Sequence, residues 1–582
     1  MDRTGALGWG QRYIWLRHHQ LPPRYRHEAH LVSSFDAPPG GVPLAMVRTT
    51  LNYLVRRHEA LRTTYHHDAD GDPWQRVHPP GPLPLVVVSA ERDGTEAPAE
   101  AIERLSTKDF DLSAEWPIRA CVVTEGGRAR QIVLVLNHIA FDAWTFDRFE
   151  KELISLRAGI AAGRPATLEP IRHQPLDLVR YEASASAAAA ARKKAMEYWR
   201  DTLTRLPADT LAPRRSTDPV PVGRAATLTS PSILDTSRRI AQRQRVWPSI
   251  VHLATYTAVV AAYTGRDAVA FLSFTGNRGT HAYADVMTCM FSPLVMNVDC
   301  TGNPTFSELV RRAAECFESA QEHAYLPYDE LLDLVSRESG RRGEIVRTGS
   351  EVNFLSQSTV SSRLRRTRLA WNPTDEAWAR YGSDTYLRIS ELQDAVAVSL
   401  HASSAVMEAE AMERFLRGYE AVLLAHDAST TDLCLDEIAA LVAFGEADPV
   451  RDALEPDPTP AGALEDLLAV VRRVNGLTEV SPGDSYPVAG GLILRIPRVL
   501  ELLAECGWAG LSVYRLAGAE SLAALAARLL RTDRPAVTDV VDATEAATEA
   551  VLVAANAGTD EAGPRDGGPA DSPRHYAAAS SR

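Results

Sequence analysis

The sequence has few cysteines, and their spacing fits neither a disulfide framework nor a zinc site. Six cysteines are spread along 582 residues, and no two of them form a Cys-x-x-Cys pair. Disulfide-rich domains and structural zinc sites both need cysteines that are closer together and paired. We therefore expect reduced and mostly buried thiols, and no bound metal.

Long hydrophobic runs and an excess of positive charge are also missing. No stretch reaches the roughly 18 uninterrupted apolar residues that a transmembrane helix needs, and residues 1–9 contain no apolar run of signal-peptide length. The formal net charge of −13 is the opposite of the basic face that nucleic-acid-binding proteins present. We expect a cytoplasmic protein that binds neither membranes nor nucleic acids.

Nucleotide-binding and calcium-binding loops are missing as well. The sequence contains no Gly-x-x-x-x-Gly-Lys-Ser/Thr loop, and we identify no adenylation domain. Residues 66–72 include an Asp-x-Asp-Gly-Asp pattern typical of calcium loops, but Pro79 stands where such a loop needs its twelfth-position glutamate. We interpret these residues as a solvated hairpin turn with Asp70 and Gly71 at its corner.

The composition is that of an ordinary globular protein, with 45% hydrophobic and 24% charged residues. Because single cores stop growing near roughly 250–300 residues, we expect two or more domains. From about residue 5 to residue 440, helical and strand-like patterns alternate, which predicts an α/β or α+β fold. The clearest segments are helices over residues 43–58, 190–203 and 248–263 and a buried strand over residues 131–136.

The C-terminal part of the sequence differs in composition and in hydrophobic periodicity. Residues 446–460 are rich in proline and acidic residues, which predicts an extended linker over residues 441–462. Residues 463–531 regain helical periodicity and predict a small helical bundle, with helices over residues 464–474, 494–505 and 521–530. The last stretch, residues 532–582, has few aromatic residues and is rich in Ala, Asp, Glu, Gly, Pro and Ser, so we expect a disordered tail.

A histidine directly follows the strand predicted over residues 131–136. Asn137 ends the strand, His138 lies in the turn, and a helix is expected to start near Thr145. A strand fixes such a side chain while the loop leaves it exposed, and the ordinary histidine pKa of about 6.5 suits a general base. An arginine that holds Asp142 would fix the loop that aims the imidazole. On this pattern alone, a structural histidine at a strand end is the commoner interpretation.

Residues 137–143, Asn-His-Ile-Ala-Phe-Asp-Ala, have companions elsewhere in the chain. In chain order these are residues 10–16 (Gly-Gln-Arg-Tyr-Ile-Trp-Leu), 57–65 (Arg-His-Glu-Ala-Leu-Arg-Thr-Thr-Tyr), 195–199 (Ala-Met-Glu-Tyr-Trp), 263–267 (Tyr-Thr-Gly-Arg-Asp), 276–278 (Gly-Asn-Arg), 323–329 (His-Ala-Tyr-Leu-Pro-Tyr-Asp) and 352–354 (Val-Asn-Phe). In this order they resemble the condensation domain family of nonribosomal peptide synthesis, which is related to chloramphenicol acetyltransferase. The resemblance covers roughly residues 5–440, and residues 137–143 correspond to the family motif His-His-x-x-x-Asp-Gly.

The resemblance implies a pseudo-dimer of two chloramphenicol-acetyltransferase-like halves, residues 1–175 and 176–440, that form a V with a central tunnel. An acyl group on the phosphopantetheine of a partner carrier protein enters from one face, and a small amine, or an amine on a second carrier, enters from the other. No covalently bound cofactor is implied.

The same resemblance assigns roles to residues. His138 positions or deprotonates the attacking amine, and Asp142 is structural, with Arg278 as its candidate partner. Trp144, Ser292 and Asn353 are implied along the substrate tunnel.

This sequence departs from the family pattern at three places. Asn137 replaces the first histidine of the motif, and its amide can still donate and accept hydrogen bonds. Ala143 replaces the glycine, and its methyl group matters if the position needs a positive φ or a close backbone approach. Residues 291–294, Phe-Ser-Pro-Leu, stand where the family commonly has Phe-Val-Asn-Thr. We therefore expect an unusual donor or acceptor.

Residues 463–531 resemble a peptidyl carrier domain through residues 484–491, Asp-Ser-Tyr-Pro-Val-Ala-Gly-Gly. In a working carrier, Gly490 and Gly491 would be followed by Asp or His and then by the serine that receives phosphopantetheine. Leu492 and Ile493 stand there instead, and isoleucine has no hydroxyl to form the phosphodiester. We expect a carrier-like fold that cannot carry, and a helical appendage with a coincidental Gly-Gly match is the alternative.

The resemblance implies a free-standing condensation enzyme of antibiotic or other secondary metabolism. It would form an amide between a carrier-bound acyl or aminoacyl thioester and an amine, in trans with carriers of other synthetase chains. Two alternatives stay open: a catalytically silent scaffold that recruits tailoring enzymes or carriers, and an acyltransferase that uses coenzyme A or forms esters. The donor, the acceptor and the oligomeric state stay open as well.

Overall fold

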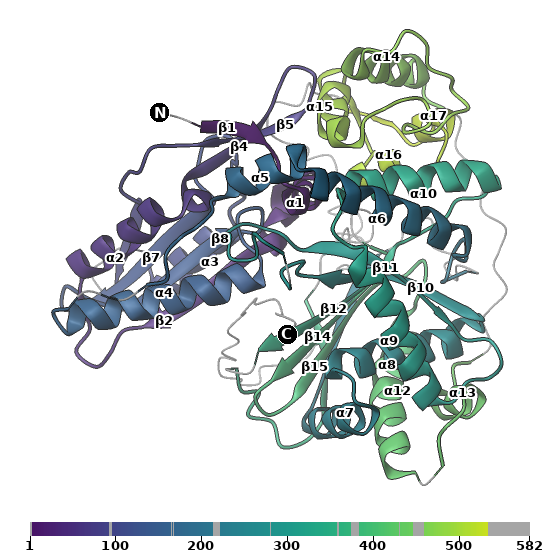
Figure 1. Ribbon diagram of the computed structural model, residues 1–582, viewed down its shortest axis with the longest axis horizontal. Helices are drawn as coiled ribbons and strands as arrows, with labels where there is room; N and C mark the ends of the chain where they lie inside the picture. The colour runs from purple at the N-terminus through teal and green to yellow at the C-terminus, as the bar shows by residue number, and fades with distance from the viewer. Residues whose placement is uncertain are drawn as a thin grey trace, which may run out of the picture.

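The computed structural model describes residues 3–21, 23–91, 96–164, 166, 168–212, 222–279, 281–357, 360–373, 383–429, 431–445 and 459–532. Most of the predicted linker (446–458) and nearly all of the predicted tail (533–582) lie outside these residues. Figure 1 shows an N-terminal and a C-terminal α/β half that spread apart as a V, with a smaller unit at the top. We call this smaller part, residues 459–532, the C-terminal unit.

The N-terminal half is built on a sheet with the strand order β2-β8-β7-β6, and β3 pairs with β8. Its strands are β2 (His30–Asp36), β3 (Val42–Pro43), β6 (Leu85–Ser89), β7 (Ile118–Glu125) and β8 (Arg128–Asn137). Alternate residues of β8 belong to two different cores: Leu134 packs with α2 (Leu44–Arg57) and α4 (Ala143–Ala161), whereas Val135 packs with α3 (Pro98–Thr107). Burial on both faces explains the continuous apolar run. The predicted strand and the predicted helix over residues 43–58 are confirmed.

A smaller sheet, in the order β1-β5-β4, flanks this half. It consists of β1 (Arg3–Ala6), β4 (Thr63–His67) and β5 (Pro73–Val77), and β4 and β5 form the predicted hairpin. Residues 68–70 of its turn are exposed, as predicted, whereas Gly71 is buried and Asp72 accepts hydrogen bonds of 2.8 and 2.7 Å from Arg495 of the C-terminal unit. Sequence patterns do not show which loops meet in space.

Several helical segments connect the halves or lie beside these sheets. They are α1 (Trp9–Gln20), η1 (Pro23–Ala29), η2 (Glu59–Arg62), α5 (Pro175–Ser184) and α6 (Ser186–Thr204). The last of these includes the helix predicted over residues 190–203.

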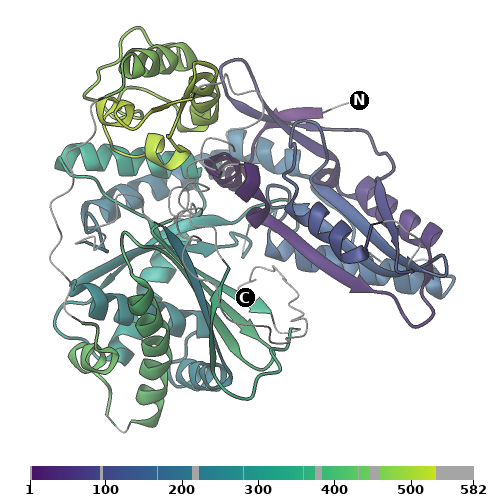
Figure 2. The ribbon, with the colours of Figure 1, turned by 180° about the vertical axis from the view of Figure 1, so that it is seen from behind.

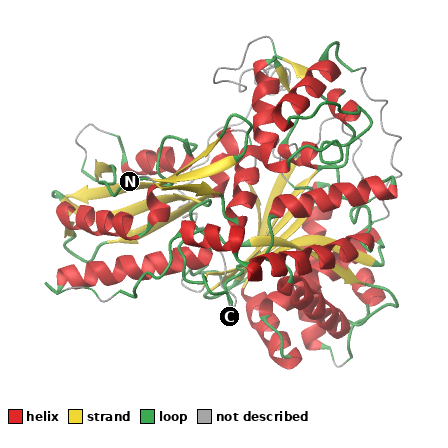
Figure 3. Ribbon diagram, turned by 45° about the horizontal axis from the view of Figure 1, so that its top comes forward, coloured by secondary structure: helices red, strands yellow, loops and turns green. Residues whose placement is uncertain are grey.

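The C-terminal half contains a sheet in the order β11-β10-β12-β14-β15-β9-β13. Its strands are β9 (Gly223–Ser230), β10 (Ala268–Thr275), β11 (Ser292–Asp299), β12 (Ser350–Gln357), β13 (Arg368–Asn372), β14 (Thr385–Leu392) and β15 (Val396–Ser403). Its helices are α7 (Pro231–Gln244), α8 (Pro248–Thr264), α9 (Phe306–Glu322), α10 (Tyr328–Arg342), α12 (Ala409–Ala428) and α13 (Leu435–Val442). Figure 3 shows the helices gathered beside the strands.

Helix α8 is buried almost all round, as its uniformly apolar sequence predicts. It packs among α7, α9 and α12 in the largest hydrophobic core of the described residues. Among the described helices, none alone has the length and apolar character of a membrane span, whereas the bent pair formed by α7 and α8 meets that test by length and composition.

The C-terminal unit contains both helices and a short two-stranded ribbon. Its elements are α14 (Ala463–Asn475), η3 (Ile493–Arg495), α15 (Ile496–Glu505), β16 (Trp508–Ala509), α16 (Val513–Ala517), α17 (Leu522–Ala526) and β17 (Leu530–Arg531). The helix predicted over residues 521–530 is too long, because α17 ends at Ala526 and Leu530 pairs with Ala509 of β16. Figure 2 shows the unit beside α10.

Candidate active site

Asn137 shapes the turn that carries His138. It is the last residue of β8, and its backbone amide donates to the carbonyl of Pro117 at 3.0 Å. Its side-chain oxygen accepts a hydrogen bond from the amide of Ile139 at 3.0 Å, and its carbonyl accepts one from Ala140 at 3.2 Å. The side-chain oxygen of Asn137 thus stabilises the turn by accepting a hydrogen bond. This role requires a hydrogen-bond acceptor, and it does not require a second imidazole.

His138 itself lies beside an aromatic ring of the C-terminal half. Its ring centroid is 4.9 Å from that of Phe291. Its Nδ1 is buried and makes no well-formed hydrogen bond with any residue in the described part of the chain. Burial lowers the pKa of His138, and backbone groups and the charge of Asp142 offset this only in part. The imidazole is therefore neutral at pH 7 and able to accept a proton.

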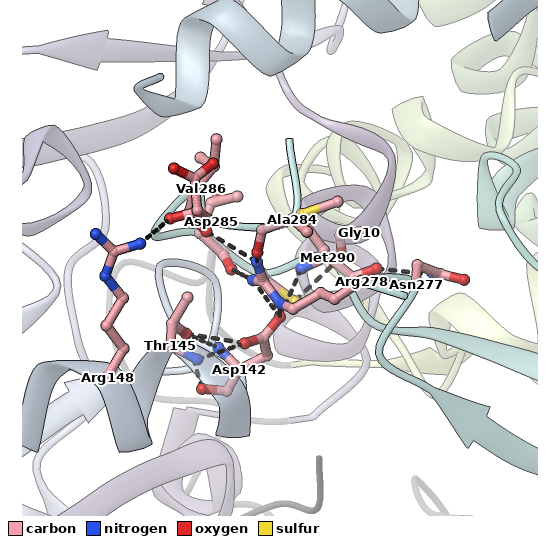
Figure 4. A network of polar contacts seen from close by, with 12 residues as sticks. Gly10, Asp142, Thr145, Arg148, Asn277, Arg278, Ala284, Asp285, Val286 and Met290 are labelled. Atoms are coloured by element: carbon pink, nitrogen blue, oxygen red, sulfur yellow. Dashed lines mark hydrogen bonds and ion pairs between the residues drawn. The ribbon is translucent and has the colours of Figure 1, made fainter. Parts of the chain in front are cut away.

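The two carboxylate oxygens of Asp142 bind partners in different halves of the molecule. Oδ1 accepts from the backbone amide of Thr145 at 3.0 Å, which caps the start of α4. Oδ2 accepts from Nη2 of Arg278 at 2.7 Å and from the amide of Met290 at 3.0 Å. Asp142 thereby joins the loop of His138, which belongs to the N-terminal half, to the C-terminal half (Figure 4).

Each nitrogen of the Arg278 guanidinium donates to at least one acceptor. Besides Asp142, its guanidinium donates to the carbonyls of Ala284, Val286 and Thr288 at 2.7, 2.9 and 2.7 Å. Arg278 is 8% exposed and Asp142 3%, so water contributes little to either charge. A buried ion pair is stable only when its remaining polar atoms are also satisfied, and here they are. We call this network of Asp142, Thr145, Arg278 and Met290 the cross-half latch.

Asn277 shapes the turn that positions Arg278 within the latch. It adopts a left-handed backbone conformation with φ 52°, which asparagine tolerates better than most residues. Its side chain donates to the carbonyl of Met290 at 2.8 Å and to the hydroxyl of Ser292, which in turn donates to the carbonyl of Ala324. Ser292, which the resemblance implies along the tunnel, thus holds this turn in place.

The other implied tunnel residues lie in different surroundings. The ring centroid of Trp144 is 4.5 Å from the guanidinium carbon of Arg278, so Trp144 covers the latch. Asn353 lies on β12 and donates to the hydroxyl of Tyr386 at 3.1 Å. The structure therefore brings Trp144 and Ser292 to the latch, whereas Asn353 has a separate partner.

Ala143 occupies the first position of α4 and is 6% exposed. It does not have a positive φ. The glycine of the family motif is therefore not needed here for backbone freedom, and the methyl group fits without backbone strain. The replacement of the motif glycine by Ala143 therefore changes only the space beside the start of α4.

Gly10 is a site residue that the sequence analysis did not single out. A Cβ on Gly10 would lie 2.5 Å from the carbonyl oxygen of Cys289 and 2.7 Å from Cα of Met290. Helix α1 thus approaches the segment that presents Met290 to Asp142 and Phe291 to His138. A glycine inside a helix is the only signal of this contact in the sequence, and it does not identify the segment on the other side.

The condensation domain model matches residues 16–441. This chain belongs to the condensation domain family. Condensation domains catalyse acyl transfer in peptide and polyketide synthetases and take their substrates from carrier proteins, and the two halves of the V are those of the chloramphenicol-acetyltransferase-like fold.

The relatives of this condensation domain are distant. Chondramide synthase cmdD of Chondromyces crocatus is 25% identical over 505 residues, which cover 81% of this chain and 12% of that synthase. The chain thus spans only a small part of this curated relative. Among solved structures, the complex of the X-domain and OxyB from teicoplanin biosynthesis matches with a TM-score of 0.56 and 18% identity, over 76% of this chain and 96% of that one. The condensation domain of the monacolin K polyketide synthase MokA matches with a TM-score of 0.58 and 17% identity, over 74% and 99%.

Replacing Gly10 with alanine is expected to destabilise this condensation domain and to slow any condensation that it catalyses. The new methyl group forces the backbone of Cys289 and Met290 away from α1, and overpacking of this kind costs about 1–3 kcal/mol. Urea denaturation measures the stability and a condensation assay the rate. The matched control is Gly340→Ala in α10, where the nearest atom to the new Cβ lies at 4.0 Å. Equal stability of the two variants would contradict the close approach of α1.

The Gly490-Gly491 pair has a structural explanation of its own. Gly490 has φ 96°, and a Cβ on Gly491 would lie 2.5 Å from the ring of Tyr486. Both positions therefore require glycine for the turn around this buried tyrosine. The following residues differ in exposure: Leu492 is 52% exposed, whereas Ile493 is 5% exposed and belongs to the core.

Proposed function

We propose that this protein forms an amide between a carrier-bound acyl thioester and an amine. The observation that carries the proposal is His138, a neutral base held in a turn between the cross-half latch and Phe291. The amine nitrogen attacks the thioester carbonyl carbon, so that a C–N bond forms and the C–S bond breaks. His138 takes the proton that nitrogen loses and returns it to the departing thiolate of phosphopantetheine.

Most of the rate enhancement would come from holding the two reactants together. Positioning of two bound reactants contributes more to such reactions than proton transfer does, and it requires that the two halves stay in register. The latch supports this requirement, because it joins the halves next to His138 through fully paired charges. Asp142, Arg278 and Asn137 are therefore positioning residues in this proposal, and His138 is the catalytic one.

The acyl carrier would be supplied by another chain. We propose that the C-terminal unit is carrier-like but carries nothing, since Ile493 replaces the attachment serine and its side chain is buried in the core of the unit. A serine at this position would also point inward, where a transferase could not reach its hydroxyl. The reaction would then take place in trans.

The test is direct. The protein is incubated with carrier proteins that hold different acyl groups on phosphopantetheine, together with a panel of amines, and amide products are detected by mass spectrometry. We expect an amide with at least one carrier-bound donor. Equal use of the same acyl group on coenzyme A, or ester formation with the matching alcohol, would favour the acyltransferase alternative.

A second candidate function is a silent scaffold that recruits a tailoring enzyme. Two observations favour it: Asn137 replaces the first motif histidine, and the matching X-domain was solved in complex with OxyB. A pull-down that retains a tailoring enzyme, together with no product from any donor and amine, would support this candidate over catalysis. The complete latch and the neutral His138 are the reasons why we rank it second.

A further inference from the structure

The first two residues of the 57–65 motif bind a buried glutamate of α4. Nε2 of His58 lies 2.7 Å and Nε of Arg57 3.0 Å from Oε2 of Glu152. Glu152 is 6% exposed and His58 2%. Burial alone would raise the pKa of this carboxyl, but the donors of His58 and Arg57 outweigh it and hold the pKa well below its usual range. Glu152 is therefore ionised, and both partners fix its position.

Glu152 in turn orients an arginine that reaches the other half. Its Oε1 accepts a hydrogen bond from Nε of Arg148, one turn earlier on α4, at 3.3 Å. Nη1 of the same guanidinium donates to the backbone carbonyl of Asp285 in the C-terminal half at 2.5 Å (Figure 4). Because the guanidinium is planar, its bond to Glu152 also fixes the direction of its other donors.

Arg148 and Arg278 hold one short stretch of backbone from opposite halves. Arg278 donates to the carbonyls of Ala284 and Val286, and Arg148 donates to the carbonyl of Asp285 between them. Three consecutive carbonyls are thus bound by side chains of both halves, as the close view shows (Figure 4).

This stretch leads directly to the active site. We call residues 284–291 the crossing segment. The amide of Met290 binds Asp142, and the ring of Phe291 lies 4.9 Å from that of His138. A shift of the crossing segment therefore changes the surroundings of the base.

The N-terminal half holds the crossing segment at two points. Asp142 stands directly before α4, and Arg148 lies about 8 Å further along the helix axis. A single contact would allow one half to pivot about it, whereas two separated contacts fix the angle between the halves. We propose that Arg148 is a positioning residue of the reaction, which sets this angle together with the latch and keeps Phe291 beside His138. The inference rests on the proposed condensation.

The variant Arg148→Met tests this role in the full-length protein, because it removes the donors and keeps the length of the side chain. We expect kcat to fall about tenfold, since a misplacement of about 1 Å can slow a reaction that depends on positioning by up to about 100-fold. The acid limb of the pH profile should stay at the same pH, because His138 itself is unchanged. A displaced acid limb would overturn the positioning role, since Arg148 would then act on the base.

Two further variants are compared with Arg148→Met. Arg157→Met removes another arginine of α4, which donates to the carbonyl of Asp36 within the N-terminal half at 3.0 Å, and should stay within about twofold of the parent rate. Arg148→Lys keeps the charge and a donor, and its rate should return to within about threefold of the parent. Equal losses in Arg148→Lys and Arg148→Met, or a loss in Arg148→Met no larger than in Arg157→Met, would overturn the proposal.

Hydrogen exchange measures the same contact without any assay of activity. The amide of Met290 donates across the halves to Asp142 at 3.0 Å. In Arg148→Met we expect this amide to exchange at least about tenfold faster than in the parent, with the amides of β8 unchanged. Parent-like exchange at Met290 would show that Arg148 does not hold the crossing segment, and this would overturn the proposal.

The two readouts separate a failure of this inference from a failure of the proposed function. If no amide product forms with any donor and amine, the condensation fails, and faster exchange at Met290 still supports Arg148 as a contact that holds the halves. If product forms, faster exchange at Met290 together with a parent-like rate would overturn the positioning role.

Discussion

His138→Ala is expected to lower the rate of amide formation by about 10²–10⁴-fold, the usual contribution of a positioned general base. The imidazole is neutral, lies beside Phe291 and follows the rigid end of β8, so its removal takes away the proton acceptor without disturbing the sheet. Single-turnover kinetics with a loaded carrier and an accepted amine measure the effect. Unfolding in urea should change little, which distinguishes a catalytic loss from a structural one.

The pH profile gives an independent readout of the same group. Because burial lowers the pKa of His138 below 6.5, the base stays neutral at pH 7 and the acid limb of the rate should lie below pH 6.5. This limb should be missing from the residual activity of His138→Ala. His66→Ala, which removes a histidine stacked on Trp74 in the small sheet, is the matched control and should keep the parent profile. An unchanged rate in His138→Ala would exclude the proposed mechanism.

Breaking the cross-half latch should have the largest effect on stability. We expect Arg278→Ala to lower the free energy of unfolding by about 3–5 kcal/mol, since it leaves the Asp142 carboxylate buried without its counter-charge. The rate should fall as well, because the loop of His138 loses its link to the C-terminal half. Urea denaturation and kcat/KM for the amine measure the two effects.

Two comparisons test the origin of the latch effect. The double variant Asp142→Asn with Arg278→Gln removes both charges and should lose less stability than the sum of the single variants. Lys151→Ala breaks an exposed pair with Asp147 of similar length, 2.6 Å, and should cost at most about 1 kcal/mol. If Arg278→Ala lowered the free energy of unfolding as little as Lys151→Ala does, the latch would not hold the halves together.

Local patterns in the sequence predict the individual helices and strands well, but they predict the tertiary contacts between them poorly. The apolar runs of β8 and α8 predict burial on all sides, because that burial is a property of each segment by itself. The pairing of Asp142 with Arg278 was expected only from the resemblance to a family, since 136 residues separate them. Neither source indicates that Gly10 touches Met290, which depends on how α1 packs in the folded chain.

The C-terminal unit shows the same limit. Periodicity predicts α14 correctly but extends the last helix from α17 to Leu530, which lies in β17 and pairs with Ala509 of β16. The Gly490-Gly491 motif indicates the turn, whereas the inward orientation of Ile493 and the docking of Arg495 on Asp72 appear only in three dimensions.

The two oxygens of the Asp142 carboxylate bind partners in different halves, which has a consequence for how one half can move relative to the other. One oxygen holds the first turn of α4, and the other holds Arg278 and the amide of Met290. Because Arg278 and Met290 belong to the C-terminal half, a hinge motion that widens the V would have to break their bonds to the second oxygen. The bonds that Thr145 and Ile139 donate lie within the N-terminal half and would remain, so the turn of His138 would stay folded and lose only its contacts with the C-terminal half.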